Sequence, residues 1–364
     1  MKIVFLVHSL RGGGAERLLL ELASSASSLG MSVTVISWLS VNDFNEEKFK
    51  NINIINLLEA NKYRWPLSLF GSSKKLGNLL AEVKPDAVFL FSHTVTWLAA
   101  LSRIQTSYIN VIMGYSQVSK GKGWRLIVYK PIDVFISHFL KTRIIAPSET
   151  LGNAALKYLL IKKNRLTVIP NGIEHQVKKK ERVRNNIFTI TMLGTLSFHK
   201  GQHLALESLR QIINKGTIVC LKILGDGSIK SHLHDLIEKY SLPADSIKIL
   251  GRRDDALEIV SNSDLFWHLS KSEGMPLAVI EAMSFQLPIV GFDVNGVREL
   301  VSNNQNGYLV QYADVEAIAE KTRILIDNED LRNKMGKRSS SEFEAKYTKN
   351  QMLMSYKEFI RDLL

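Results

Sequence analysis

Short apolar runs alternate with helix-like amphipathic segments along most of the chain. The first run, Met1–Val7, leads through a glycine-rich loop into a helical segment that ends at Gly30, and a second apolar run follows at Met31–Trp38. Such an alternation is typical of parallel strands joined by crossover helices. The opening of the chain therefore predicts a strand, loop, helix, strand unit of an α/β fold.

The same alternation continues towards the C-terminus, with residues 42–84 less regular than the rest. Further strands are expected at the apolar parts of PDAVFLFSH, RIIAPSE, LTVIPNGIE, IFTITMLG, LKILG, IKILG, SDLFWHLS and LPIVGF. Ser148 is expected to cap the helix that follows RIIAP, because a serine hydroxyl can accept a hydrogen bond from a free helical N–H. A parallel α/β architecture is thus predicted for the whole chain.

A chain of 364 residues is too long for one compact core and suggests two domains. The polar, charged segment at residues 175–186 shows no periodicity and is typical of a linker. We therefore expect a first domain at residues 1–172, a linker at 173–187 and a second domain at 188–349.

The positive charge is concentrated in the first half. Residues 1–170 carry 21 Lys and Arg against 10 Asp and Glu, whereas residues 171–364 carry 26 against 25. Such asymmetry favours an anionic partner for the first half, either phospholipid headgroups or nucleic acid, with a merely solvated basic surface as the alternative.

Two segments of the first half mix basic and aromatic residues. Asn61–Leu80 and Ser119–Lys141 both have the composition of membrane-interface segments. The first could equally pack as a helix, and the second could bind nucleic acid. Because no nucleic-acid-binding motif accompanies them, an anionic membrane surface is the expected partner and nucleic acid is not.

The chain offers no sign of secretion or of a transmembrane segment. Because Cys220 is the only cysteine, a disulfide framework and a thiolate metal site are both excluded. Cys220 lies in an apolar run and is expected to be a buried strand residue. Neither a signal-like start nor an apolar stretch of bilayer length is present. We expect a cytoplasmic protein.

The most informative stretch is Ser270–Met283, SKSEGMPLAVIEAM. It follows an apolar strand and opens a helix, so free N–H groups near Gly274 could hold a phosphate. Glu273 and Glu281 are too far apart to act as an acid and base pair, but they could accept hydrogen bonds from a sugar and a ribose. The implied ligand is a nucleotide sugar. Alternatively, Glu273 caps the helix and Glu281 is solvated.

Three other features have candidate chemistry. The glycines of HSLRGGGAE lack the G-x-G-x-x-G spacing of dinucleotide-binding folds and could instead bring backbone close to a ligand. His93 ends a predicted parallel strand, where ligands bind in such sheets. Lys200 lies in a loop before an amphipathic helix, where its ammonium could stabilise a departing diphosphate. Alternatively, the glycines form a flexible turn, His93 is a structural histidine and Lys200 is a surface lysine.

In this order, HSLRGGGAE, the strand before His93, VIPNGIE, GTLSFHKG and SEGMPLAVIEAM resemble the motifs of the retaining glycosyltransferases of family four, among them enzymes of bacterial surface polysaccharide synthesis. The resemblance implies a GT-B fold, in which two Rossmann-like domains face each other across a cleft. It implies acceptor binding by the first domain, donor binding by the second, and a C-terminal helix at 350–364 that returns to the first.

The resemblance also implies the site. The catalytic residues would be His93, Lys200 and Glu273. The donor-binding residues would be Gly13, Gly14, Gly194, Thr195, Lys200, Arg252, Glu273, Gly274, Met275, Pro276, Leu277 and Glu281. Thr195 departs from the family pattern, which has an arginine there. Arg252 or Arg253 could replace that charge, or Lys200 and the helix amides could carry more of it.

The implied reaction moves a hexose or N-acetylhexosamine from a nucleoside diphosphate sugar, most simply a UDP-sugar, to a glycan or lipid-linked saccharide, with an α-glycosidic product. No metal or other cofactor is expected, and the enzyme would associate peripherally with the inner face of the cell membrane. The alternatives are a non-catalytic binder of nucleotide sugars or nucleic acid and, less simply, an NAD-dependent oxidoreductase.

Overall fold

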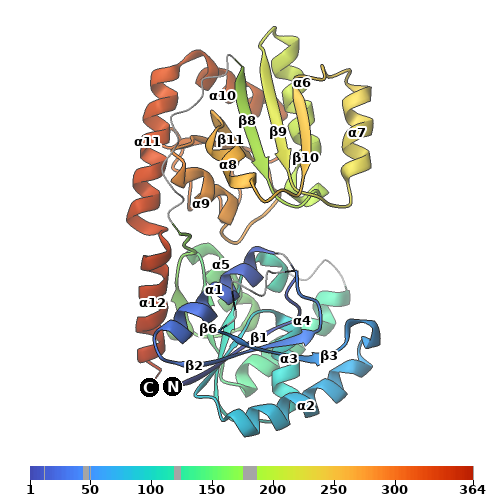
Figure 1. The fold of residues 1–364 in the computed structure, drawn as a ribbon, viewed down its shortest axis with the longest axis vertical. Coiled ribbons are helices and arrows are strands. Elements are labelled where there is room, and N and C mark those ends of the chain that lie inside the picture. Colours follow the sequence, from blue (N-terminus) through green and yellow to red (C-terminus); the bar gives the residue numbers. More distant parts are fainter. Residues whose placement is uncertain (12, 44–48, 50, 119–123, 175–186, 364) are drawn as a thin grey trace. The chain divides into compact units, whose positions relative to one another are not determined.

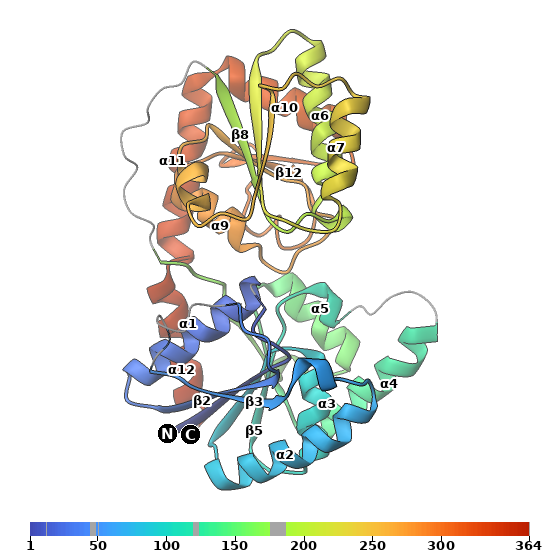
Figure 2. The same cartoon turned by 45° about the vertical axis from the view of Figure 1, so that its right-hand side comes forward.

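A computed structural model describes residues 1–11, 13–43, 49, 51–118, 124–174 and 187–363. The chain divides into two compact units, Met1–Ile169 with Leu353–Leu364 and Pro170–Met352. Each unit has its own parallel sheet with helices on both faces (Figures 1 and 2). The predicted linker at 173–187 lies largely outside the described residues.

The sheet of the first unit is seven-stranded within the described residues and entirely parallel, in the order β3-β2-β1-β4-β5-β6-β7. Its strands are β1 (Lys2–Val7), β2 (Ser32–Leu39), β3 (Asn53–Leu58), β4 (Ala87–Leu90), β5 (Ser107–Val111), β6 (Arg143–Ala146) and β7 (Leu166–Val168). Its helices are α1 (Gly14–Ser28), α2 (Leu67–Val83), α3 (His93–Ser102), α4 (Trp124–Phe139) and α5 (Glu149–Leu159).

The side chains of β1, an interior strand, alternate between the two faces of this sheet. Val4 and Leu6 belong to a core formed with α2, α3 and α4. Phe5 lies on the other face, where it stacks on Phe89 at 5.2 Å and lines a small cavity beside α1 and α12 (Lys349–Arg361). β1 is therefore buried on both faces of the sheet, as is usual for strands of parallel sheets.

The second unit contains a six-stranded parallel sheet within the described residues, in the order β10-β9-β8-β11-β12-β13. Its strands are β8 (Phe188–Leu193), β9 (Val219–Leu224), β10 (Ile247–Gly251), β11 (Leu265–His268), β12 (Ile289–Phe292) and β13 (Gly307–Val310). Its helices are α6 (Gln202–Asn214), α7 (Lys230–Lys239), α8 (Ala256–Ser261), α9 (Leu277–Ser284), α10 (Val315–Asp327) and α11 (Glu329–Lys346).

The predicted α/β class and the paired Rossmann-like sheets are confirmed. Ser148 caps α5 as expected, its hydroxyl accepting from the Leu151 amide at 3.2 Å. Cys220 is buried in β9. No described helix combines the length and apolar character that crossing a bilayer demands.

Two strands of the first unit were not predicted. β3 lies within residues 42–84, where the apolar pattern is less regular, and asparagines flank its first two apolar residues. β5 contains Asn110, a buried polar residue that interrupts its short apolar run. Both strands complete a sheet whose other members supply the hydrogen-bonding partners, and this tertiary requirement leaves little trace in the local pattern.

Candidate active site

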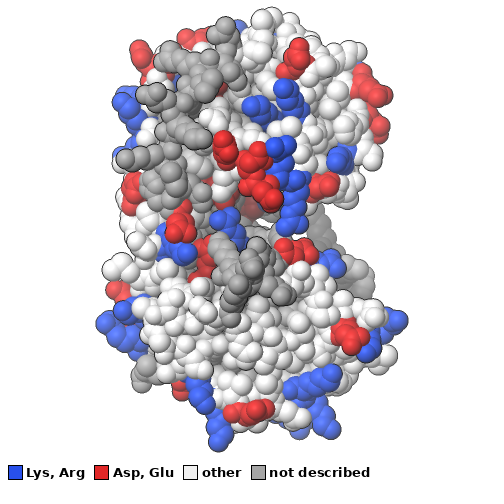
Figure 3. Space-filling view, in the orientation of Figure 1, with Lys and Arg blue, Asp and Glu red and all other residues white. Residues whose placement is uncertain are grey.

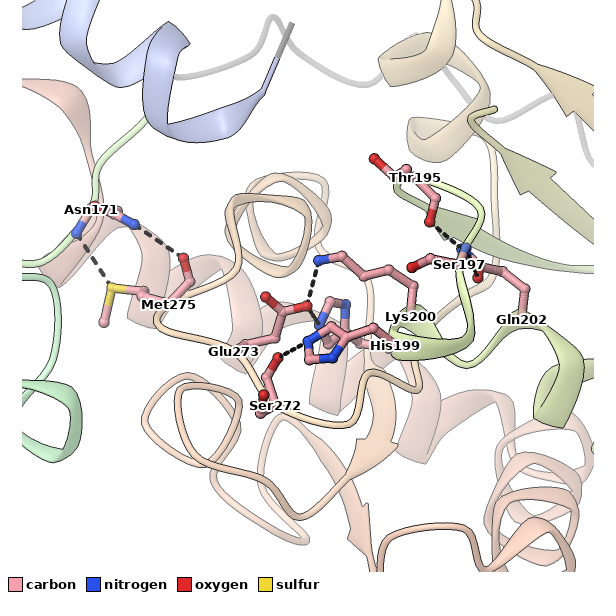
Figure 4. Close-up of polar contacts among 10 residues, drawn as sticks. Asn171, Thr195, Ser197, His199, Lys200, Gln202, Ser272, Glu273 and Met275 are labelled. Atoms are coloured by element: carbon pink, nitrogen blue, oxygen red, sulfur yellow. Dashed lines mark hydrogen bonds and ion pairs between the residues drawn. The ribbon is translucent and has the colours of Figure 1, made fainter. Parts of the chain in front are cut away.

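Two loops lie side by side at the carboxyl edge of the second sheet, because β8 and β11 are neighbouring parallel strands. Residues 194–201 follow β8, and residues 269–276 follow β11. The amide of Lys271 donates to the carbonyl of His199 at 2.8 Å, and His199 Nε2 lies 2.8 Å from the carbonyl oxygen of Ser272 (Figure 4). These contacts hold the two loops together.

Lys200 and Glu273, both predicted as catalytic, meet in the space between these loops (Figure 4). Lys200 Nζ donates to Glu273 Oε1 at 2.5 Å, and His268 Nε2 lies 3.2 Å from the same oxygen. The Glu273 side chain is only 13% exposed, and that of His268 only 5%. A mostly buried carboxylate therefore lies between an ammonium group and an imidazole.

The environment of Glu273 has two opposing effects on its pKa. Burial alone would raise the pKa of this carboxyl, but the hydrogen bonds and charges of His268 and Lys200 outweigh burial and hold the pKa well below its ordinary value. Glu273 is thus an anion at neutral pH. It can accept hydrogen bonds from hydroxyl groups but has no proton to donate.

Close backbone contacts support the Lys200 loop. Gly201 has φ +75°, and a Cβ there would lie 2.0 Å from the carbonyl oxygen of Leu269. Gly225 has φ +132°, and a Cβ would lie 2.0 Å from the carbonyl oxygen of Gly194. Only glycine fits where backbones approach so closely. The turn Gly225-Asp226-Gly227, which follows β9, therefore supports the loop that carries Lys200.

Thr195 lies exposed at the start of this loop, where the family pattern has an arginine. Its carbonyl accepts from Gln202 Nε2 at 3.1 Å (Figure 4). Of the two arginines that could replace the missing charge, Arg253 is bound to Asp255 by two hydrogen bonds of 2.6 and 2.7 Å. Arg252 is exposed and follows β10 directly. Arg252 is therefore the freer of the two cations.

The helix after Glu273 starts later than expected. Pro276 is the N-cap of α9 and Leu277 its first residue, whereas the sequence analysis placed the helix start near Gly274. The residue before a proline is disfavoured in helical conformation, which keeps Met275 out of the helix. As a result, Glu281 lies little more than one turn into α9. It is buried, at 5% exposure.

Asn171, from the phrase VIPNGIE, anchors this loop. Its side-chain amide donates to the carbonyl of Met275 at 3.0 Å, and its backbone amide approaches the Met275 sulfur at 3.3 Å (Figure 4). Asn171 is not among the site residues predicted from the sequence, although it lies in the motif VIPNGIE. The sequence shows an asparagine in this phrase, but it shows neither its burial nor its partner, which is 104 residues away.

In the first unit, His93 is the first residue of α3, and its ring packs against that of Trp97. The neighbouring Thr94 hydroxyl lies 3.3 Å from Nδ1 of His8 at the end of β1. Burial lowers the pKa of His8, and the charge of Arg11 lowers it further. His8 is thus a neutral imidazole beside Thr94, and it is not among the site residues predicted from the sequence.

The predicted glycine loop lies at the start of α1. Gly13 is the N-cap and Gly14 the first helical residue. A Cβ on Gly13 would lie 2.3 Å from a carboxylate oxygen of Glu16. Burial raises the pKa of Glu16. The glycine therefore makes room for the Glu16 carboxylate above the helix start.

Two family models match the chain. The model of glycosyl transferases group 1 covers residues 174–342, and that of glycosyltransferase family 4 covers residues 12–177. Together they span both units. The chain belongs to the family 4, group 1 glycosyltransferases. Its assignment to this family from the sequence motifs is thereby confirmed.

Named relatives of this glycosyltransferase include bacterial enzymes of polysaccharide assembly. It is 26% identical to the capsular polysaccharide biosynthesis glycosyltransferase CapM of Staphylococcus aureus, over 66% of this chain and 70% of that one. It is 29% identical to the UDP-Gal:α-D-GlcNAc-diphosphoundecaprenol α-1,3-galactosyltransferase of Escherichia coli, over 57% of each chain.

Solved structures show the same fold. Anabaena HepE, crystallised in complex with UDP, superposes with a TM-score of 0.84 at 18% identity, and the match covers all of both chains. The GT-B fold expected from the sequence is therefore confirmed.

The low pKa of Glu273 makes its contribution to stability depend on pH. A carboxyl whose pKa is lowered by folding stabilises the fold fully when the pH is above its pKa in the unfolded chain, here 4.5. This stabilisation is lost as the pH falls towards the pKa in the folded protein. We predict that Glu273→Gln lowers the free energy of unfolding by about 3 kcal/mol at neutral pH. Below about pH 4.5 this difference should narrow.

Urea unfolding of both proteins at a series of pH values measures this difference. Glu320→Gln, which changes an exposed carboxylate of the same unit, is the control and should alter stability by less than about 0.5 kcal/mol. A difference between wild type and Glu273→Gln that stays constant down to acidic pH would show that Glu273 is not held ionised by its neighbours.

Proposed function

We propose that this glycosyltransferase moves a hexose or N-acetylhexosamine from a UDP-sugar to a glycan acceptor with retention of the anomeric configuration. The observation that carries the proposal is the cluster of Lys200, Glu273 and His268 at the carboxyl edge of the second sheet. It places a cation suited to a diphosphate beside an anion suited to sugar hydroxyls.

The donor would lie along the two loops of the second unit. Lys200 and the first amides of α9 would face the diphosphate, since both favour negative charge. Glu273 would accept hydrogen bonds from the sugar, and Glu281 from the ribose. Gly194 and Thr195 would lie against the nucleotide, and Arg252 would supply the charge that Thr195 lacks.

The choice of UDP rests on relatives. HepE was crystallised with UDP, and the E. coli relative is named for UDP-galactose. The same E. coli enzyme is named for an acceptor on diphosphoundecaprenol. We extend both features to this protein and propose a lipid-linked saccharide as acceptor, in the assembly of a surface polysaccharide. Gly13, Gly14 and His93 of the first unit would contact the reacting sugars.

In the proposed reaction, the bond between the anomeric carbon and the diphosphate oxygen breaks, and its electron pair stays on that oxygen. Lys200 and the α9 amides stabilise the developing charge without a metal ion. The acceptor hydroxyl attacks the same face of the sugar and passes its proton to the departing diphosphate. An α-linked donor thus gives an α-glycoside, and no side chain forms a covalent intermediate.

Donor class can be tested by thermal shift. We predict that one UDP-sugar raises the melting temperature by several degrees at saturating concentration, because a ligand present at about 100 times its Kd adds about 2.7 kcal/mol to the stability of the folded state. GDP- and ADP-sugars should stabilise less, NAD should not stabilise at all, and EDTA should leave the shift unchanged. Stabilisation by NAD alone would contradict a glycosyltransferase.

Substitution of the site tests the assigned roles. Lys200→Ala should reduce transfer from that donor by about 10²- to 10³-fold, because a cation that faces the leaving group is lost. Glu281→Ala should mainly weaken donor binding. Lys215→Ala, which removes an exposed lysine from the other end of α6, is the control for charge. Near-normal transfer by both site variants would refute the donor site.

A further inference from the structure

Helix α4 of the first unit presents apolar side chains to solvent. Val128, Ile132, Phe135 and Phe139 are 46%, 38%, 68% and 58% exposed. Their spacing of four, three and four residues places them on one face of the helix. The rings of Phe135 and Phe139 stack at 6.1 Å. We call these four residues the apolar stripe.

Packing fixes the orientation of the stripe. On the opposite side of α4, Asp133 is 6% exposed and accepts hydrogen bonds from Trp97 Nε1 at 2.6 Å and from the Tyr158 hydroxyl at 2.8 Å. Ile136 is buried beside it in the core. Rotation of α4 to bury the stripe would break both hydrogen bonds and expose a buried residue. The stripe therefore stays on the surface.

A basic cavity adjoins the C-terminal end of the stripe. It has a volume of about 460 Å³ and is lined by Arg103, Lys141 and Arg143, with Phe139 shared between the cavity and the stripe. All three basic side chains are exposed, and none of the residues that line the cavity is acidic. The cavity lies where β5 and β6 begin, at the opposite edge of the sheet from His93.

We propose that the apolar stripe and the basic cavity together bind the surface of an anionic phospholipid bilayer. The stripe would enter the headgroup region, and the cavity would receive a lipid phosphate. The inference rests on the proposed function, since a lipid-linked acceptor brings the enzyme to a membrane. Of the two segments with the composition of a membrane interface, Asn61–Leu80 and Ser119–Lys141, the second contains α4 and is the one assigned to the membrane.

Charge supports this partner. The first half of the chain carries a net charge of +11, and Figure 3 shows lysine and arginine side chains around the lower edge of the first unit. A two-fold contact between copies of this surface would bring the same three cations close to one another, which is unfavourable. Nucleic acid would pair with the cations but would leave Val128 and Ile132 without a role. An anionic bilayer satisfies both parts of the surface.

Vesicle flotation of the full chain tests the proposal at about 0.1 M salt. The vesicles are phosphatidylcholine alone, or phosphatidylcholine with about a third phosphatidylglycerol. We expect binding to the anionic vesicles only. Phe135→Glu should weaken this binding about tenfold, because it removes an inserted apolar side chain. Lys141→Gln with Arg143→Gln should weaken it about 25-fold, at about fivefold for each cation.

Matched controls lie in the second unit. Ile218→Glu changes an apolar side chain that is 78% exposed, and Lys334→Gln with Lys337→Gln removes two exposed cations from α11. Both should bind vesicles like the wild type. Equal loss in the controls, or no loss in Phe135→Glu and in the Lys141 and Arg143 double variant, would overturn the assignment to this surface.

Two further outcomes would also overturn it. A dimer in sedimentation velocity that Phe135→Glu converts to a monomer would assign the stripe to a second copy of the chain. Binding of RNA or DNA that depends on Lys141 and Arg143, without vesicle binding, would assign the cavity to nucleic acid. The UDP-sugar thermal shift needs no membrane, so a failed vesicle experiment leaves the proposed reaction separately testable.

Discussion

A mostly buried carboxylate needs compensating charge, and this constraint shapes the active edge of the second unit. Glu273 can remain ionised only because Lys200 and His268 lie beside it. His268 ends β11, whereas Lys200 comes from the loop after the neighbouring strand, so sheet topology brings the partners together. The hydrogen bond to Glu273 also fixes the position of the Lys200 ammonium group. A cation in a fixed position stabilises the charge of a departing diphosphate.

The backbone segments around Lys200 and Glu273 approach one another so closely that glycine is needed at the points of contact. Gly201 faces the carbonyl of Leu269, Gly225 faces that of Gly194, and Gly296 has φ +82° against the carbonyls of Glu273 and Gly274. Asn171 then ties Met275 to the segment that opens the unit. The geometry of the pair thus depends on the close approach of its own two loops at Gly201, and on contacts from three other stretches of the chain, at Gly225, Gly296 and Asn171.

The strands whose apolar runs are uninterrupted could be predicted from the sequence, as could the Ser148 cap and the proximity of the Lys200 loop to SEGMPLAVIEAM. β3 and β5 could not, because asparagines interrupt or flank their patterns and their partners are distant in sequence. α9 begins three residues beyond the predicted position near Gly274, because the residue before Pro276 is disfavoured in helical conformation. His268 and Asn171 could not be predicted as site residues from the sequence. A single polar residue is common there, and its partner is apparent only in the folded structure.

In the proposed site, Lys200 binds the diphosphate and Glu273 binds the donor sugar. Calorimetric titration of the Glu273→Gln variant with UDP, and with the UDP-sugar that stabilises the wild type most, tests it directly. We expect the variant to bind UDP about as tightly as the wild type, because Lys200 is retained, but to lose the additional affinity for the UDP-sugar. Equal losses for both ligands, or no loss for either, would contradict it.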